Sequence, residues 1–94
     1  MGVLKKPVLA HDVFIDDYGF ETTKDGYQRC FKCLGGKHYL WVIIPYELTR
    51  IKYRLETDKG ETVYTASDVI PPKTEILDII NMLDDAITDI LEDW

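Results

Sequence analysis

The sequence predicts an α+β fold, with about five antiparallel strands in a β-meander and a C-terminal amphipathic helix packed on one face. Three observations predict this class. Short apolar segments recur between residues 11 and 66, and turn-forming glycines separate several of them. Such short connections favour antiparallel neighbours, because parallel strands need crossover segments of about a dozen residues. From residue 72 onwards, apolar residues recur instead at the spacing of a helix.

The strands are predicted from alternation and from turn residues. Residues 1–10 show no period and are expected to form a leader that is loose or lies along an edge, before a single α+β domain over 11–94. The segment Tyr39–Ile44 is apolar on both faces, which is typical of a central strand covered on each side. The five strands are expected at about 11–21, 27–34, 37–44, 50–57 and 61–66.

The predicted fourth strand alternates most clearly. Its apolar residues point to the core, and its charged residues point to solvent. The solvated face carries Arg50, Lys52 and Arg54, which Lys32 from another strand would join. With exposed aromatic residues, such a face would make a platform for single-stranded nucleic acid. The net charge of −6 argues against nucleic-acid binding, because phosphate neutralisation dominates that affinity.

A helix is predicted over about 72–93, with Pro72 as its first residue. Its apolar residues form one stripe, which would cover a face of the sheet or form the seam of a dimeric coiled coil. The stripe consists of Ile76, Ile79, Ile80, Leu83, Ala86, Ile87, Ile90, Leu91 and Trp94. The predicted core consists of Val13, Ile15, Phe31, Trp41, Ile43, Ile51, Tyr53, Leu55, Ile76, Ile80, Leu83, Ile87 and Ile90.

The net negative charge belongs to the C-terminal segment. Residues 1–70 hold ten acidic and ten basic side chains, whereas residues 71–94 hold seven acidic side chains and one lysine. Acids near a helix C-terminus oppose the helix dipole by about 0.3–1 kcal/mol each. The acidic row therefore either keeps the protein soluble or meets a basic partner. The predicted partner-binding residues are Asp78, Asp85, Asp89 and Glu92, with Asp84 and Asp93 beside them.

Cys30, Cys33 and His38 come nearest to a metal motif. Their C-x2-C-x4-H spacing resembles the start of a retroviral-type zinc knuckle. Structural zinc needs four protein ligands, yet Ile43 stands at the fourth position and only His11 remains as a distant candidate. On a strand, the two cysteines would also point to opposite sides of the sheet. We therefore expect ordinary thiols and no metal or cofactor, with metal binding by these three residues left open.

No catalytic site is predicted. His11 and His38 have no nucleophile at a recognisable spacing. The paired acids Asp16-Asp17 and Asp84-Asp85 have side chains that point in different directions. Without a geometry of nucleophile, base and orienting group, we expect a protein that is not an enzyme.

These observations favour a non-enzymatic protein–protein interaction module whose acidic helix face engages a basic, nucleic-acid-binding partner. In size and charge placement the chain resembles bacteriophage-encoded inhibitors that mimic the charge of DNA, including anti-CRISPR proteins. The alternatives are a nucleic-acid-binding module that uses the basic sheet face, or a dimerising structural or accessory subunit. The longest apolar run is too short to cross a bilayer. The expected location is the cytoplasm, which is the host cytoplasm for a phage-encoded protein.

Overall fold

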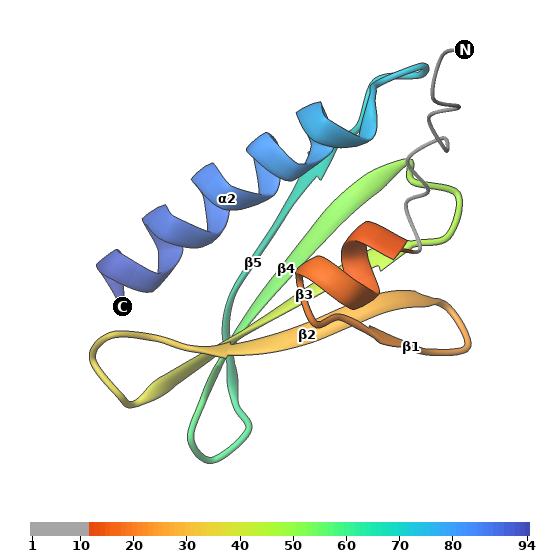
Figure 1. Ribbon diagram of the computed structural model, residues 1–94. Coiled ribbons are helices and arrows are strands. Elements are labelled where there is room, and N and C mark those ends of the chain that lie inside the picture. Colours follow the sequence, from red (N-terminus) through yellow and green to blue (C-terminus); the bar gives the residue numbers. More distant parts are fainter. Residues whose placement is uncertain (1–11) are drawn as a thin grey trace, which may run out of the picture.

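The computed structural model describes residues 12–94, so the predicted leader and His11 lie outside the described residues. The described chain forms one π-helical turn, five strands and one α-helix (Figure 1). The strands make one antiparallel sheet in the order β1-β2-β3-β4-β5. The predicted α+β class, an antiparallel five-stranded sheet with a C-terminal helix, is confirmed. The elements are η1 (Val13–Asp17), β1 (Glu21–Thr22), β2 (Gly26–Lys32), β3 (His38–Pro45), β4 (Arg50–Thr57), β5 (Thr62–Val69) and α2 (Ile76–Asp93).

The register of the sheet decides which side chains meet. Leu40 of β3 lies opposite Leu55 of β4 on one side and Phe31 of β2 on the other. Where β2 begins, the backbones come so close that a Cβ added at Gly26 would lie 2.2 Å from the carbonyl oxygen of Ile44. Only glycine fits there without a backbone shift. This close approach helps to fix the pairing of β2 with β3.

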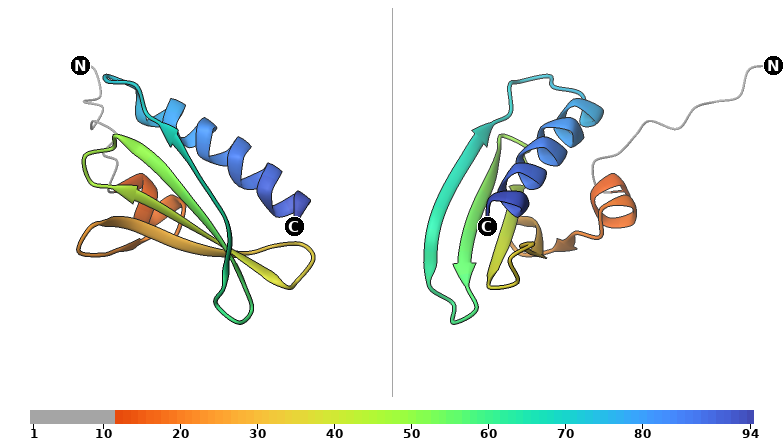
Figure 2. Two further views of the ribbon diagram at one scale, coloured as in Figure 1. Left: turned by 180° about the vertical axis from the view of Figure 1, so that it is seen from behind. Right: turned by 90° about the vertical axis from the view of Figure 1, so that its left-hand side faces the viewer.

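The core lies between the sheet and α2, which runs across one side of the sheet (Figure 2). Alternate residues of β3 and β4 point to that side, as the period of a strand requires. From α2, Ile79 and Leu83 enter the same cluster and are 1% and 0% exposed. The fully buried large side chains are Phe14, Leu40, Val42, Ile44, Ile51, Leu55, Ile79 and Leu83.

The strand predicted over 11–21 is wrong, because residues 13–17 form the π-helical turn η1 and only Glu21–Thr22 pair as a strand. The turn buries Phe14, whose ring lies 5.1 Å from that of Tyr27 and 5.8 Å from that of Phe20. Burial of this aromatic cluster outweighs the strand preference of Val13 and its apolar neighbours. The segment η1 therefore packs against the core through Phe14 and does not extend the sheet.

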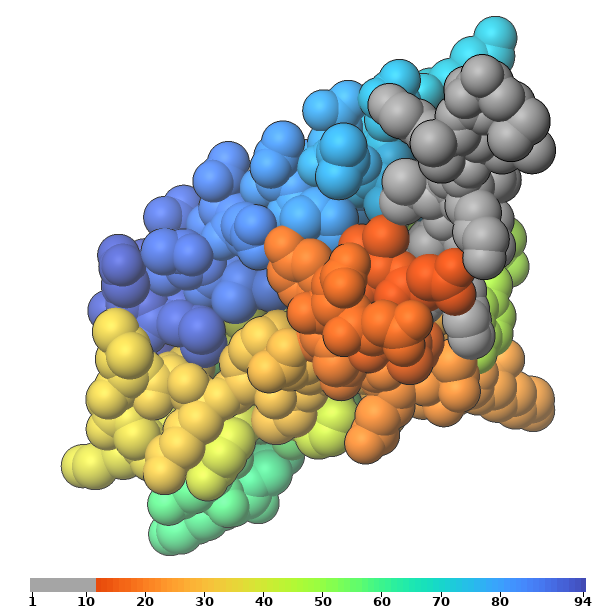
Figure 3. Space-filling model, in the orientation of Figure 1, coloured from red at the N-terminus to blue at the C-terminus, as the bar shows by residue number. Residues whose placement is uncertain are grey.

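The turn η1 lies beside α2 on the same side of the sheet (Figure 3). The Tyr18 hydroxyl, just after η1, donates to the Asp84 carboxylate of α2 at 3.1 Å. The Arg29 guanidinium of β2 donates to the Tyr18 carbonyl oxygen and lies over the Phe31 ring, 4.5 Å from its centroid. Together, η1 and α2 cover this side of the sheet, which we call the covered face.

Trp41 and Ile43 are not in the core, so their predicted burial is wrong. The core residues of β3 are Leu40, Val42 and Ile44, whereas Trp41 and Ile43 are half-buried on the opposite side of the sheet. No described element covers that side, which we call the open face (Figure 2). Both faces of β3 are apolar, so its alternation did not indicate which face points inwards.

The helix α2 begins at Ile76 rather than at Pro72, so the predicted start is wrong. Lys73 has a φ of 64°, outside the helical region, and Glu75 has the extended backbone of an N-cap residue. The Thr74 amide donates to the Pro71 carbonyl at 3.2 Å, which closes a turn before the helix. Of the predicted core residues on α2, Ile80, Leu83 and Ile87 are buried, whereas Ile76 and Ile90 are half-buried.

Candidate interaction surfaces

The predicted acidic residues of α2 are all exposed, but the structure divides them among three places. Asp84 accepts the Tyr18 hydrogen bond next to η1. Asp89 and Asp93 line a groove between α2 and β5. The remaining three, Asp78, Asp85 and Glu92, form no ion pair within residues 12–94. The row predicted from the sequence is therefore not one uniform surface.

The groove between α2 and β5 has a volume of about 270 Å³ and an acidic lining. Three carboxylates face it, from Asp68 of β5 and from Asp89 and Asp93 of α2. Tyr53 of β4 and Tyr64 of β5 supply aromatic walls. No lysine or arginine of the described chain lines this groove. Its chemistry therefore suits a cationic side chain, which gains from carboxylates and from aromatic faces.

A hydrogen bond holds one wall of the groove in place. The Tyr53 hydroxyl donates to Oδ2 of Asp68 at 3.2 Å. Burial, together with the adjacent Asp68 carboxylate, raises the pKa of Tyr53. The hydroxyl therefore stays protonated at neutral pH and remains a donor. It positions the Asp68 carboxylate at the groove without neutralising its charge.

The outer edge of β5 borders the same groove. β5 is the last strand of the sheet, and no described residue pairs with its outer edge (Figure 2). Val63, Tyr64 and Val69 are 44%, 44% and 71% exposed, respectively. An unpaired edge presents backbone N–H and C=O groups that another extended chain can pair with. The groove and the edge together form what we call the α2–β5 site.

The C-terminal end of α2 is anchored, which positions the two aspartates of the groove. The Leu34 amide in the β2–β3 turn donates to the Leu91 carbonyl at 3.2 Å. The Trp94 ring lies 5.1 Å from the His38 ring and 6.4 Å from the Tyr64 ring. These contacts fix the last turn of α2 against two hairpins.

The open face has the opposite charge. Arg50, Lys52 and Arg54 are exposed along β4, beside the half-buried Trp41 and Ile43 of β3. A groove of about 470 Å³ follows this cationic row. The cations were predicted from the alternation of β4, whereas the aromatic residue was missed because the sequence placed it in the core. The lining residues are Ile43, Arg50, Lys52, Tyr53, Arg54, Thr65, Ala66 and Ser67.

Cys30, Cys33 and His38 do not converge. Cys30 is exposed on β2, whereas Cys33 is buried just after that strand. Partial burial of the Cys30 sulfur, with the nearby Glu56 carboxylate, raises the pKa of that thiol, and burial raises the pKa of Cys33. Both shifts are the reverse of the shift that activates a redox cysteine. Within residues 12–94, no three His, Cys, Asp or Glu side chains group as a metal ion requires. The predicted distant ligand, His11, lies outside the described residues.

Comparisons with known proteins identify no relative from which a function could be inferred. The chain matches no protein-family model, no curated protein sequence and no solved structure. Over residues 12–94, no helix combines the length and the apolar character needed to cross a membrane.

Proposed function

We propose that this chain is a non-enzymatic protein-interaction module whose α2–β5 site binds a basic partner. The observation that carries the proposal is the groove in which Asp68, Asp89 and Asp93 converge with Tyr53 and Tyr64. Three carboxylates from two elements face one recess that has no cation of its own. A lysine or arginine side chain would supply the missing charge.

The outer edge of β5, with which no residue of 12–94 pairs, indicates how such a partner would lie. An extended segment that pairs with β5 would place every second side chain on the α2 side of the sheet. A lysine or arginine at one of these positions would then reach the groove. Backbone pairing would supply affinity, and the groove would supply selectivity for basic residues.

The partner class that we propose is a nucleic-acid-binding protein, because such proteins present basic segments. Binding would occupy the surface that the partner otherwise uses for phosphates, which makes this chain an inhibitor of the phage-encoded, DNA-mimic or anti-CRISPR type. The small size and the concentration of acids in residues 71–94 support this class. We propose the cytoplasm as its location, in keeping with two cysteines that are both free.

The test compares two variants that remove the same number of carboxylates. In the groove variant, Asp68, Asp89 and Asp93 become Asn. In the control variant, the exposed Asp16, Asp17 and Asp25 become Asn, so both variants lose three negative charges. Each tagged protein is used to capture partners from a lysate at equal concentration and salt.

We expect the wild type and the control variant to capture the same basic protein, and the groove variant to lose it by about 10- to 100-fold, as for charged hydrogen bonds. The captured protein should then lose nucleic-acid binding when the wild type is added. Equal capture by the groove variant would contradict the site. Retained nucleic-acid binding in the presence of saturating wild type would contradict the inhibitor class.

The free β5 edge could instead pair with β5 of a second copy, as in the dimerising subunit considered above. The two uses exclude each other because the edge takes one strand. Sedimentation equilibrium at increasing concentration distinguishes them. We expect a monomer mass of 10.9 kDa throughout. A dimer that Val69→Lys abolishes would assign the edge to self-association.

A further inference from the structure

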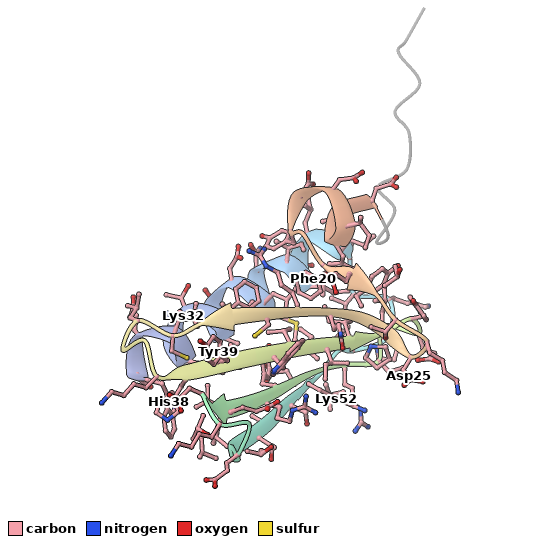
Figure 4. All side chains as sticks on the ribbon, turned by 90° about the horizontal axis from the view of Figure 1, so that it is seen from below. Phe20, Asp25, Lys32, His38, Tyr39 and Lys52 are labelled. Atoms are coloured by element: carbon pink, nitrogen blue, oxygen red, sulfur yellow. The ribbon has the colours of Figure 1, made fainter. Side chains whose placement is uncertain are left out.

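The open face sets aromatic side chains beside cations, whereas the α2–β5 site sets them beside carboxylates. Tyr39 and Trp41 lie two residues apart on β3, so both side chains are on this face and their Cα atoms are about 6.7 Å apart. Arg54 of β4 lies directly opposite Trp41, and Lys52 lies opposite Ile43. Figure 4 views the sheet from the side away from α2, with Tyr39 on β3 and Lys52 on β4 labelled. An aromatic row and a cationic row therefore run side by side.

Most cations of this face form no ion pair with another residue of the described chain. The one ion pair of the described chain joins Nε of Arg54 to the Glu56 carboxylate at 3.0 Å. Arg50 and Lys52 are exposed and have no ion-pair partner within residues 12–94. On the other side of the aromatic row, Lys32 of β2 lies opposite Tyr39. Each ring thus has one cation directly across from it, while Glu56 of β4 lies on the other side of Tyr39 and Cys30 of β2 lies on the other side of Trp41.

These features fit a ligand that carries both planar groups and negative charges. Nucleic-acid bases stack on aromatic side chains, and phosphates pair with arginine and lysine. A duplex keeps its bases stacked inside, where the rings of a sheet cannot reach them. An acidic polypeptide would pair with the cations but would leave the rings unused.

We propose that the open face binds single-stranded nucleic acid, with bases on Tyr39 and Trp41 and phosphates along Arg50, Lys52 and Arg54. This function is separate from the proposed function, because it uses the other side of the sheet and a partner of opposite charge. The net charge of −6, which argues against nucleic-acid binding, comes entirely from residues 71–94. The acids of α2 lie on the covered face (Figure 2), and salt screens charges beyond about 8 Å at physiological ionic strength.

The first experiment measures Trp41 directly. In a Trp94→Phe background, Trp41 is the only tryptophan, because the chain has two. We titrate this protein with a mixed-sequence oligonucleotide of about twelve nucleotides, as single-stranded DNA and RNA and as duplex DNA, and with polyglutamate. We expect quenching of the tryptophan fluorescence by the single strands, with at least tenfold weaker binding of the duplex and of polyglutamate.

The second experiment separates stacking from charge, with anisotropy of a labelled single strand as the readout. Trp41→Leu should weaken binding by about 5- to 150-fold, and Trp41→Phe should restore most of it, because one base stack is lost and regained. Replacing Arg50, Lys52 and Arg54 by Ala should weaken binding at least tenfold and reduce the slope of log affinity against log salt by about 2.

A matched control removes three exposed lysines from the hairpin turns, through Lys24→Ala, Lys37→Ala and Lys59→Ala. This control should bind as the wild type does. The proposal is overturned if single strands leave the Trp41 fluorescence unchanged, or if polyglutamate binds as tightly as they do. It is also overturned if the lysine control loses as much affinity as the open-face variant. Circular dichroism checks the fold, and the charge variants decide the question if Trp41→Leu unfolds.

Discussion

The two sides of the sheet differ in what covers them and in what charge they present. The covered face carries the core, and the acidic α2–β5 site lies at its border. The open face has no described element over it and carries a cationic row beside half-buried aromatic residues. Strand β4 contributes to both faces. Its residues Ile51, Tyr53 and Leu55 point to the core, and the residues between them are exposed on the open face. One alternating strand therefore contributes to the core on one face and to the proposed nucleic-acid site on the other.

The largest expected effect concerns stability and belongs to the covered face. Leu83 is fully buried between α2 and the sheet, whereas Leu77 on the same helix is 64% exposed. Leu83→Ala should lower the free energy of unfolding by about 2–5 kcal/mol, because it removes buried methyl groups and leaves a cavity. Leu77→Ala should change it by less than about 0.5 kcal/mol. Urea denaturation measures both, and equal losses would contradict the described packing of α2.

The second prediction concerns the independence of the two surfaces. Replacing Arg50, Lys52 and Arg54 by Ala should abolish most nucleic-acid binding while it leaves capture of the basic partner within about twofold. The groove variant, in which Asp68, Asp89 and Asp93 become Asn, should lose capture of the basic partner and keep nucleic-acid binding within about twofold. Titration and quantitative capture with each variant measure the two effects. Loss of both activities in either variant would mean that the surfaces act as one site.

The third prediction concerns the Tyr53–Asp68 hydrogen bond, which supports the groove from the core. Tyr53→Phe should lower the free energy of unfolding by about 1 kcal/mol at neutral pH, the usual net value of one hydrogen bond. Because the pKa of Tyr53 is raised above its ordinary value of 10.0, the folded state keeps this proton after the unfolded state has lost it.

The stability that Tyr53 contributes is therefore fully present below pH 10 and is lost as the pH rises further. Urea titrations between about pH 8 and pH 11 should show a steeper fall for the wild type than for Tyr53→Phe. Parallel curves for the two proteins would contradict the assigned role of this hydroxyl.

The smallest effect concerns the acids at the end of α2. Glu92 and Asp93 lie in its last turn, where there is no basic residue to offset them. Glu92→Gln and Asp93→Asn should each raise the free energy of unfolding by about 0.3–1 kcal/mol, because negative charge opposes the dipole there. Thermal denaturation at low salt checks the sign. A loss of stability would mean that these acids serve the fold rather than a partner.

Much of the fold could be predicted because its patterns are local. The alternation of β4 and the apolar stripe of α2 each identify an inward face, and Leu83 and Ile87 are buried as that stripe predicts. The face of β3 could not be predicted, since Trp41 and Ile44 are both apolar and point to opposite sides. Its orientation depends on pairing with β2 and β4, which is a long-range property.

The candidate sites show the same division. The acids of α2 were visible in the sequence, and so were the cations of β4. The groove was not, because β5 mixes polar and apolar residues on both faces and Asp68 lies beyond the strand predicted over 61–66. They become parts of a site only when β5 lies beside α2. Likewise, Phe14 was assigned to a strand because the aromatic cluster around it spans distant segments.

Chemical-shift mapping tests the central claim, that the molecule has two separate surfaces of opposite charge. The ¹⁵N-labelled protein is titrated with a single-stranded oligonucleotide and, separately, with an extended peptide of alternating arginine and threonine. We expect the oligonucleotide to shift the Trp41 indole and the amides of Lys52 and Arg54, and the peptide to shift the amides of Tyr64, Asp68 and Asp89, which line only the α2–β5 groove. Shifts of the same residues by both ligands would contradict the claim.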